Sequence, residues 1–349
     1  MSSVLIDIPT LQINGNDLQN FLRFIYKHEK LLKDFGAIKV QANIDCKLAL
    51  KKRPKNLPLN PIMKKIIKIN ENINIYSVQT IDHINIYSVQ TIDHINKSSQ
   101  KYFGKTDENT FWSSLSSSNN EQQGLNTSLS SNTSFFIQRT SSTYFDLHRI
   151  PNQSLLKLGG RKLTNQFVPC VKRAQGPGAI FPLMSARQHL FSIDYHHEGG
   201  DHHWYIIPSN QREALQNLIE QQNLSICLDH GQLFIDPSVL DKNCIRYHRI
   251  IQHPNEFIVL SAGTLTQSYS EDTSWSESIS FALPSWIEDG HATISLLPCQ
   301  CHVEQNCVVD TIDVALFKQE LIQKYITSYL QTTANDETSV FTGSSFCWL

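Results

Sequence analysis

Short apolar runs separated by turn-forming residues fill residues 144–286, and this pattern constrains the fold more than any other feature of the chain. The runs are rich in β-branched and aromatic residues, which favours strands over helices. One helix is expected to interrupt the strands at 209–222, where Leu215, Leu218 and Ile219 share one face. Many short strands with one inserted helix predict a mainly β fold with helices, a small barrel or jelly roll. The clearest runs lie at 191–195, 204–207, 232–236, 246–251, 256–260 and 278–282.

Both ends of the chain are predicted to pack helices onto this barrel. Residues 1–45 read as a compact unit, in which Asn16 or Asp17 caps a helix with apolar residues at three- and four-residue spacing. Gly36 is expected to end the helical region before a short strand. Residues 312–330 are amphipathic at the same spacing and predict a helix on the barrel.

The segment between these parts is unusual in two ways. Residues 73–83 recur without change at 84–94, and two copies are too few for a solenoid, so we interpret them as a local duplication. Because eleven residues are close to three helical turns, residues 46–96 are predicted as a helical linker. Residues 97–143 are dominated by Ser, Asn, Thr and Gln, which cannot bury enough apolar area, and are predicted as a disordered loop.

Composition narrows the classes of function. The formal net charge of -2 over 349 residues provides no general field for nucleic acid, and the lysine clusters at 51–55 and 64–68 are interpreted as solvated surface. The amino-terminal residues lack the features of a signal peptide, and no apolar run is long enough to cross a membrane. A soluble intracellular protein is expected, in which the eight cysteines are core residues or metal ligands.

Several blocks, in their order and spacing, carry a resemblance to a known family. The chain resembles the JmjN/JmjC family of histone lysine demethylases and their non-catalytic relatives, most closely the trimethyl-lysine demethylases. The blocks are IPT at 8–10, FGKTDENT at 103–110, DYHHEG at 194–199, WYIIP at 204–208, DPSVL at 236–240, NEFIV at 255–259 and ESISFALPSW at 277–286. With the resemblance, the predicted division is 1–45 JmjN-like, 46–96 linker, 97–143 loop, 144–298 JmjC barrel, 299–332 zinc-like segment and helix, and 333–349 tail.

The resemblance implies a double-stranded β-helix, a cupin-like barrel that holds Fe(II) and 2-oxoglutarate in active members. The iron there needs two imidazoles and one carboxylate. The positions that match this triad are occupied by Met184, Ala186 and Thr266. The position of the lysine that binds 2-oxoglutarate is His202, and that of a nearby asparagine is Asp194. Both Fe(II) and 2-oxoglutarate are therefore predicted to be absent, as in a non-catalytic member.

Two other metal sites come into consideration. His196, His197, His202 and His203 could form a relocated site, although we favour the interpretation that His197 is the ordinary family residue and the others are turn surface. His189 is also available, but at the wrong strand phase. The trimethyl-lysine demethylases carry a structural zinc, and the resemblance implies that His230, Cys299 and Cys301 are ligands here. Cys227 is taken as the fourth ligand, although it stands three residues before His230 where the family has six; His302 and Cys307 are competing ligands, and the alternative is that these are scattered thiols.

The leading hypothesis is a catalytically inactive JmjC protein that acts as a binding or scaffold module in chromatin regulation. Its expected partner is a histone tail or a chromatin-complex protein, its expected compartment is the nucleus, and neither a DNA-binding domain nor a membrane contact is predicted. The alternatives are an active Fe(II)/2-oxoglutarate-dependent demethylase with an atypical site, and a degenerating gene copy. The repeat, the Ser/Asn-rich stretch and the lost ligands favour the last, whereas the retained alternation of the strands counts against it.

Overall fold

The described strands pair into one large sheet, which is antiparallel except at the β1–β2 pair. The computed structural model describes residues 7–43, 48, 50, 57, 59–81, 107–117, 122–137, 145–222, 226–294 and 311–331. The order in the sheet is β1 (Thr10–Ile13), β2 (Ala37–Ala42), β12 (Glu256–Leu260), β8 (Phe191–Gly199), β14 (Ser274–Phe281), β6 (Cys170–Ala174), β5 (Gln122–Ser131), β3 (Asn60–Asn70), β4 (Ile73–Ile81), β10 (His230–Ile235), β7 (Ala179–Met184), β13 (Leu265–Ser270), β9 (His202–Ile207) and β11 (His248–Gln252).

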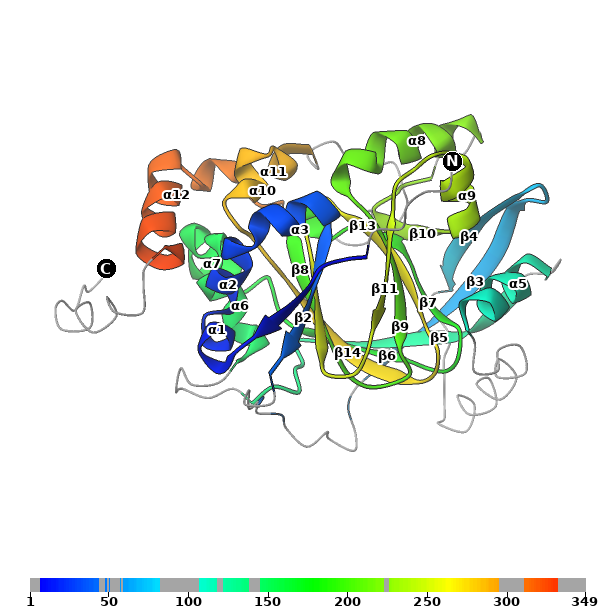
Figure 1. The fold of residues 1–349 in the computed structure, drawn as a ribbon, viewed down its shortest axis with the longest axis horizontal. Helices are drawn as coiled ribbons and strands as arrows, with labels where there is room; N and C mark the ends of the chain where they lie inside the picture. Colours follow the sequence, from blue (N-terminus) through cyan, green and yellow to red (C-terminus); the bar gives the residue numbers. More distant parts are fainter. Residues whose placement is uncertain are drawn as a thin grey trace.

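The sheet curls so that β8, β12 and β14 face β7, β9 and β13 (Figure 1). Successive side chains of a strand point to opposite faces. On β8, Ile193 and Tyr195 therefore enter the core cluster that also holds the helices of both chain ends. On β9, Tyr205 and Ile207 enter a second core cluster on the other flank. The residues that alternate with these on β8 and β9 point the other way, into the space between the two facing halves of the sheet. The predicted mainly β, jelly-roll fold is confirmed.

The amino-terminal unit is built from three short helices instead of one. They are α1 (Gly15–Gln19), α2 (Phe21–Lys27) and α3 (Glu29–Phe35), and Gly36 ends the last of them in the left-handed conformation, as predicted. The predicted cap at Asn16 or Asp17 was wrong: the cap is Asn14, whose side chain accepts a hydrogen bond of 2.9 Å from the free amide of Asp17. Next to β1, β2 pairs with β12, so this unit continues the barrel sheet.

The predictions for the middle of the chain were wrong. Residues 60–81 are the β3–β4 hairpin instead of a helical linker, and β4 takes up residues 73–81 of the first repeat copy; the second copy lies outside the described residues. In the stretch predicted as a disordered loop, α5 (Glu108–Ser117) packs Phe111 and Trp112 into the second core, and β5 pairs with β3 and β6. Backbone pairing explains β5, because a central strand satisfies its amides whatever its side chains are.

Short helices cover the two flanks of the barrel (Figure 1). The inserted helix was predicted correctly: it follows a 3-10 turn and buries Leu215, Leu218 and Ile219. The amphipathic tail also packs as predicted, with Ile322 and Tyr325 in the first core. Among the described residues, no helix is long and apolar enough to cross a membrane. The remaining helices are α6 (Ile150–Gln153), α7 (Gly160–Thr164), α8 (Arg212–Gln221), α9 (Pro237–Lys242), α10 (Ser285–Glu288), α11 (His291–Ile294) and α12 (Gln319–Tyr325), which a π-helical turn (Ile326–Leu330) extends.

Candidate functional site

The residues predicted at the iron-ligand positions lie close together at one end of the barrel. Met184 ends β7 and is paired across the ladder with Thr266 of β13. Ala186 follows two residues later and packs partly buried against the first core. The Met184 side chain is 47% exposed, whereas Thr266 is buried. This donor set does not fit Fe(II): a thioether is a weak ligand, a methyl group is none, and a neutral hydroxyl cannot replace an imidazole.

His202 and Asp194 meet other polar side chains inside the barrel. His202 Nε2 lies 2.6 Å from the hydroxyl of Ser274, and its ring stacks on His196 with centroids 4.6 Å apart. Asp194 accepts a hydrogen bond of 3.0 Å from Lys172, while its second carboxylate oxygen has no partner among the described residues. We call these five side chains the interior polar cluster.

The electrostatics of this cluster differ from those of a carboxylate-binding site. Burial, aided by His196 and Lys172, holds the pKa of His202 well below its ordinary value, so its imidazole is neutral at pH 7. The ammonium group of Lys172 is already paired with Asp194. Neither group therefore offers a free positive charge to the far carboxylate of 2-oxoglutarate.

The four clustered histidines do not form a relocated metal site. His196 and His202 point into the barrel, while the alternate residues of the same strands point outward. His197 lies 2.7 Å from Glu277 on one flank, and His203 lies 2.7 Å from Glu271 on the other. The interpretation of His196, His202 and His203 as turn surface was also wrong, because all three are buried in strands.

His189 lies in a 3-10 turn (Arg187–His189), outside any strand, with Nε2 3.5 Å from Asp229. His189 therefore has no strand phase, and the predicted strand placement was wrong. Among the described residues, no three His, Cys, Asp or Glu side chains are grouped closely enough to hold a metal.

Half of the predicted zinc site lies within the described residues. Cys227 Sγ and His230 Nδ1 are 3.1 Å apart in the turn that leads into β10. His230 is also paired across the ladder with Met184, so this pair adjoins the end of β7. Cys299, Cys301, His302 and Cys307 lie outside the described residues.

Lys64 was missed by the sequence reasoning. It was interpreted as solvated surface, but it is buried beside the interior polar cluster, where its ammonium group donates to the Ile180 carbonyl at 3.0 Å and lies 5.9 Å from the Phe181 ring. Burial, with a smaller contribution from Lys172, lowers the pKa of Lys64 to about 7. The sequence held one signal of this placement, since Lys64 shares a strand face with two isoleucines, at 62 and 66.

Lys172 and Ser274 were also missed. The pairing of β14 between β6 and β8 brings Lys172 toward Asp194. Ser274 reaches His202 of β9 through the turn from β13 to β14, since Ser270 of β13 is paired with His202 and bonds to Ser274. Alternation could have placed Asp194 and His196 on one face of β8, but it could not say which residues of other strands face them.

Comparisons with known proteins show which family and which relatives this chain is similar to. Residues 175–281 match the family described as "JmjC domain, hydroxylase". Protein Jumonji of Gallus gallus is 32% identical over 112 residues, which cover 31% of this chain and 9% of the relative. Lysine-specific demethylase 4D of Rattus norvegicus is 30% identical over 118 residues, or 32% of this chain and 22% of the relative.

A longer match is to the Lid2 complex component lid2 of Schizosaccharomyces pombe, 28% identical over 235 residues, which cover 57% of this chain and 15% of that protein. The chain thus spans less than a quarter of the length of each of these relatives.

Proposed function

We propose, from the premise that this chain carries a JmjC domain over residues 175–281, that it is a catalytically inactive binding or scaffold module of chromatin. The observation that carries the proposal is the donor set of Met184, Ala186 and Thr266, which offers a thioether, a methyl group and a neutral hydroxyl where iron needs two imidazoles and a carboxylate. The proposed partner is a histone tail or a chromatin-complex protein, and the proposed compartment is the nucleus.

The interior polar cluster supports the same conclusion for 2-oxoglutarate. The position where the resemblance implies a lysine holds His202, a neutral imidazole already bonded to Ser274. Asp194 adds a carboxylate to the same space, and Coulomb repulsion inside a protein acts with an effective dielectric far below that of water. The ammonium group of Lys172 is already paired with Asp194, and burial beside the cluster lowers the pKa of Lys64 to about 7, so neither lysine is a full and unpaired positive charge at pH 7.

The barrel has kept its buried cores and its internal hydrogen bonds, which supports a maintained fold over a degenerating copy. By the same reasoning residues 7–43 are inferred to act as a JmjN-like unit, since β2 completes the barrel sheet beside β12.

Restoring the donors tests the proposal. The triple variant Met184→His, Ala186→Glu and Thr266→His is expected to take up about one Fe(II) per chain under anaerobic conditions, because it recreates the two-imidazole, one-carboxylate set. The wild-type chain is expected to take up none, as measured by calorimetric titration. Stoichiometric iron in the wild type, or formaldehyde and succinate released from methylated histone H3 peptides, would instead establish the atypical-demethylase alternative.

We also propose a structural zinc held by Cys227, His230, Cys299 and Cys301. The 3.1 Å approach of Cys227 Sγ to His230 Nδ1 supports it, because it brings the two atoms to within the roughly 3.6 Å that separates two ligands of one tetrahedral zinc ion. A bound zinc would tie the turn before β10 to the segment after α11.

The expected zinc content is about one ion per purified chain by elemental analysis. Cys227→Ser is expected to abolish it, and Cys299→Ser likewise, with a lowered melting temperature in both. Cys170→Ser serves as the matched control, because Cys170 lies on β6 and is not part of the proposed site. Unchanged zinc content in both site variants contradicts this assignment.

A further inference from the structure

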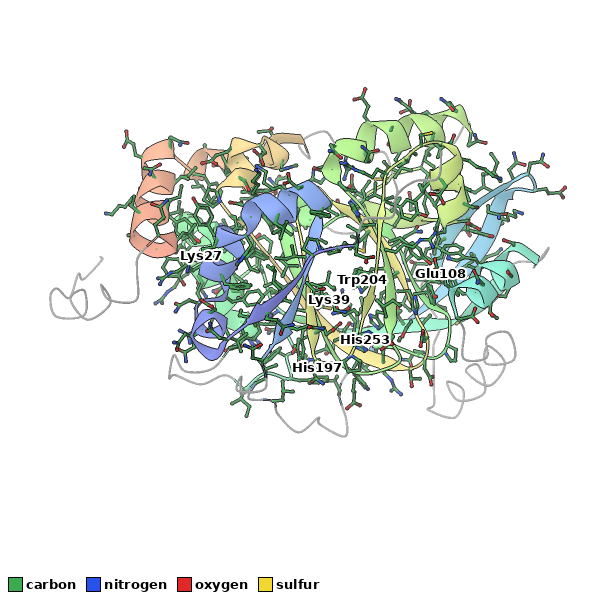
Figure 2. The ribbon with its side chains drawn as sticks, viewed as in Figure 1. Lys27, Lys39, Glu108, His197, Trp204 and His253 are labelled. Carbon is green, nitrogen blue, oxygen red and sulfur yellow. The ribbon has the colours of Figure 1, made fainter. Side chains whose placement is uncertain are left out.

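A cavity of 420 Å³ lies at the seam of the sheet, where its first strands approach its last one. Ile8 and Lys39 line one side of the seam, and Trp204 of β9 and Ile250 of β11 line the other. In Figure 2 the labelled Lys39, Trp204 and His253 gather at this seam. The cavity is separate from the interior polar cluster and shares none of its residues.

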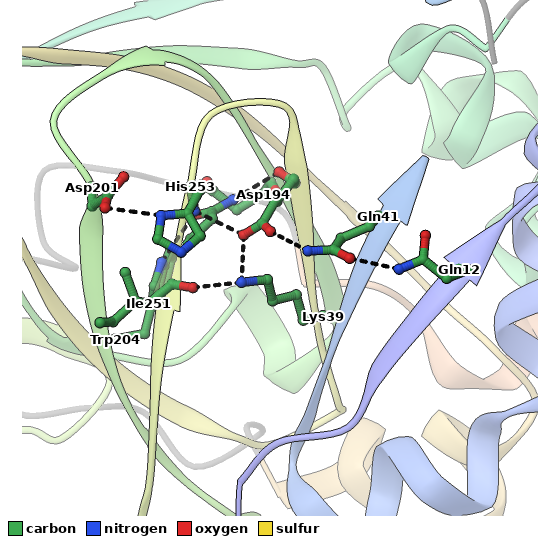
Figure 3. A network of polar contacts seen from close by, with 10 residues as sticks. Gln12, Lys39, Gln41, Asp194, Asp201, Trp204, Ile251 and His253 are labelled. Carbon is green, nitrogen blue, oxygen red and sulfur yellow. Dashed lines mark hydrogen bonds and ion pairs between the residues drawn. The ribbon is translucent and has the colours of Figure 1, made fainter. Parts of the chain in front are cut away.

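The outer edge of β11 faces this cavity. Among the described strands β11 pairs only with β9, and it ends the sheet. The Ile251 carbonyl points away from β9, since it accepts a hydrogen bond of 2.8 Å from Lys39 (Figure 3). Because main-chain groups alternate along an antiparallel strand, the amide of Ile251 and both main-chain groups of Arg249 face the same way. The Ile251 side chain is 43% exposed beside them.

The polar surroundings of the cavity are acidic. Asp7 and Glu108 line it, and Glu108 pairs with Arg249 of the same lining. Three more carboxylates pair with lining residues: Glu256 with Lys39, Glu271 with His203 and Asp201 with His253. The permanent cations of the lining are Lys39 and Arg249, which pair with Glu256 and Glu108, so the five carboxylates outnumber them. Asp7 is exposed and has no ion-pair or hydrogen-bond partner among the described residues. Coulomb attraction at this seam therefore favours a positively charged ligand.

We propose that an extended peptide carrying Lys or Arg side chains binds at this seam as an added strand on β11. An open strand edge supplies main-chain hydrogen bonds to such a peptide, and the neighbouring side chains select it by charge. The inference rests on the proposed function, in which the chain is a binding module. It adds that the partner is a cationic, extended peptide and that the edge of β11 receives it.

The test uses fluorescence anisotropy with the labelled peptide Thr-Lys-Ile-Arg-Val-Thr and its acidic counterpart Thr-Glu-Ile-Glu-Val-Thr. The cationic peptide is expected to bind at least about tenfold more tightly than the acidic one. Ile251→Pro removes the outward amide without touching the ladder to β9, and is expected to weaken binding by about tenfold. Ile251→Val keeps that amide and is the matched control, with binding unchanged.

A double variant tests the contribution of the acidic side chains without altering the backbone. Asp7→Asn with Glu108→Gln keeps the size of both side chains and is expected to weaken binding of the cationic peptide by about tenfold at low salt. If Ile251→Pro lowers the melting temperature, the result of this double variant decides whether the peptide binds at the seam. Equal affinity for the two peptides, or a charge-neutralised variant that binds like the wild type, overturns the inference. Iron uptake by the wild-type chain would defeat the proposed inactivity but would leave these peptide affinities unchanged.

Discussion

Replacing Lys64 by Met is expected to raise the free energy of unfolding at pH 7 by about 3 kcal/mol. Lys64 is buried, and its ammonium group has the Ile180 carbonyl and the Phe181 ring face as its neighbours. Desolvation disfavours its charged form, which lowers its pKa to about 7 in the folded protein. Each pKa unit of difference between folded and unfolded chains corresponds to about 1.4 kcal/mol. Methionine has nearly the same length and carries no charge to desolvate.

The same substitution is expected to change the pH dependence of stability. The ordinary pKa of lysine is 10.5, so between about pH 7 and that value the unfolded chain binds more protons than the folded one. Stability of the wild type should therefore rise from pH 7 toward pH 9.5, by about 3 kcal/mol from this group alone. The Met variant should lose that rise. Measurements stop at about pH 9.5 because the tyrosines of the unfolded chain begin to ionise near pH 10.

Urea unfolding of both proteins at the two pH values measures these differences. Lys68→Met is the control, since Lys68 lies on the same strand but is only half-buried, and its effect is expected to stay within about 0.5 kcal/mol. Equal slopes of stability against pH for the wild type and the Lys64 variant would show that this lysine is hydrated in the folded protein.

Trp286→Ala is expected to cost about 4 kcal/mol of unfolding free energy. Its indole is fully buried, packs edge-on against Phe317 at 5.5 Å, and donates to the Gln188 carbonyl at 2.9 Å. The Gln188 side chain in turn bonds to both main-chain groups of Ile312, where the described tail begins. Removing the indole leaves a large cavity and an unpaired carbonyl at the point that attaches the tail to the barrel.

The loss should be largest in the tail itself. Hydrogen exchange of residues 311–331 is expected to accelerate more than exchange in β8 or β14, because α12 packs on the side of the core that Trp286 fills. Leu321→Ala is the matched control on the same helix, where the side chain is 40% exposed and the expected cost is within about 0.5 kcal/mol. A cost below about 1 kcal/mol for Trp286→Ala contradicts the attachment.

The parts of the fold that the sequence predicted correctly are those in which local pattern and packing agree. The period-two runs of β8, β9 and β12 and the period of α8 bury the residues that the pattern marks as apolar. The repeat misled because its length suits three helical turns, although its first copy is rich in isoleucine, tyrosine, valine and threonine, the residues that strands favour. The polar β5 could not be predicted, because only its pairing with β3 and β6 satisfies it.

Only part of the candidate site could likewise be predicted from the sequence. The resemblance located Met184 and Thr266 at facing positions of two strands, and the structure pairs them. It could not reveal that Lys172 pairs with Asp194, or that His196 stacks on His202, because these contacts join strands that are distant in the sequence. Charge counting also could not predict the acidic seam, which gathers residues from both ends of the sheet.

The central claim is that the barrel lacks a donor set for iron. Its most direct test is a crystal of the wild-type protein soaked anaerobically with Fe(II) and 2-oxoglutarate, with diffraction recorded on both sides of the iron absorption edge. The account predicts no anomalous peak between Met184 and Thr266. A peak at that position, bound by side chains of the barrel, would contradict it.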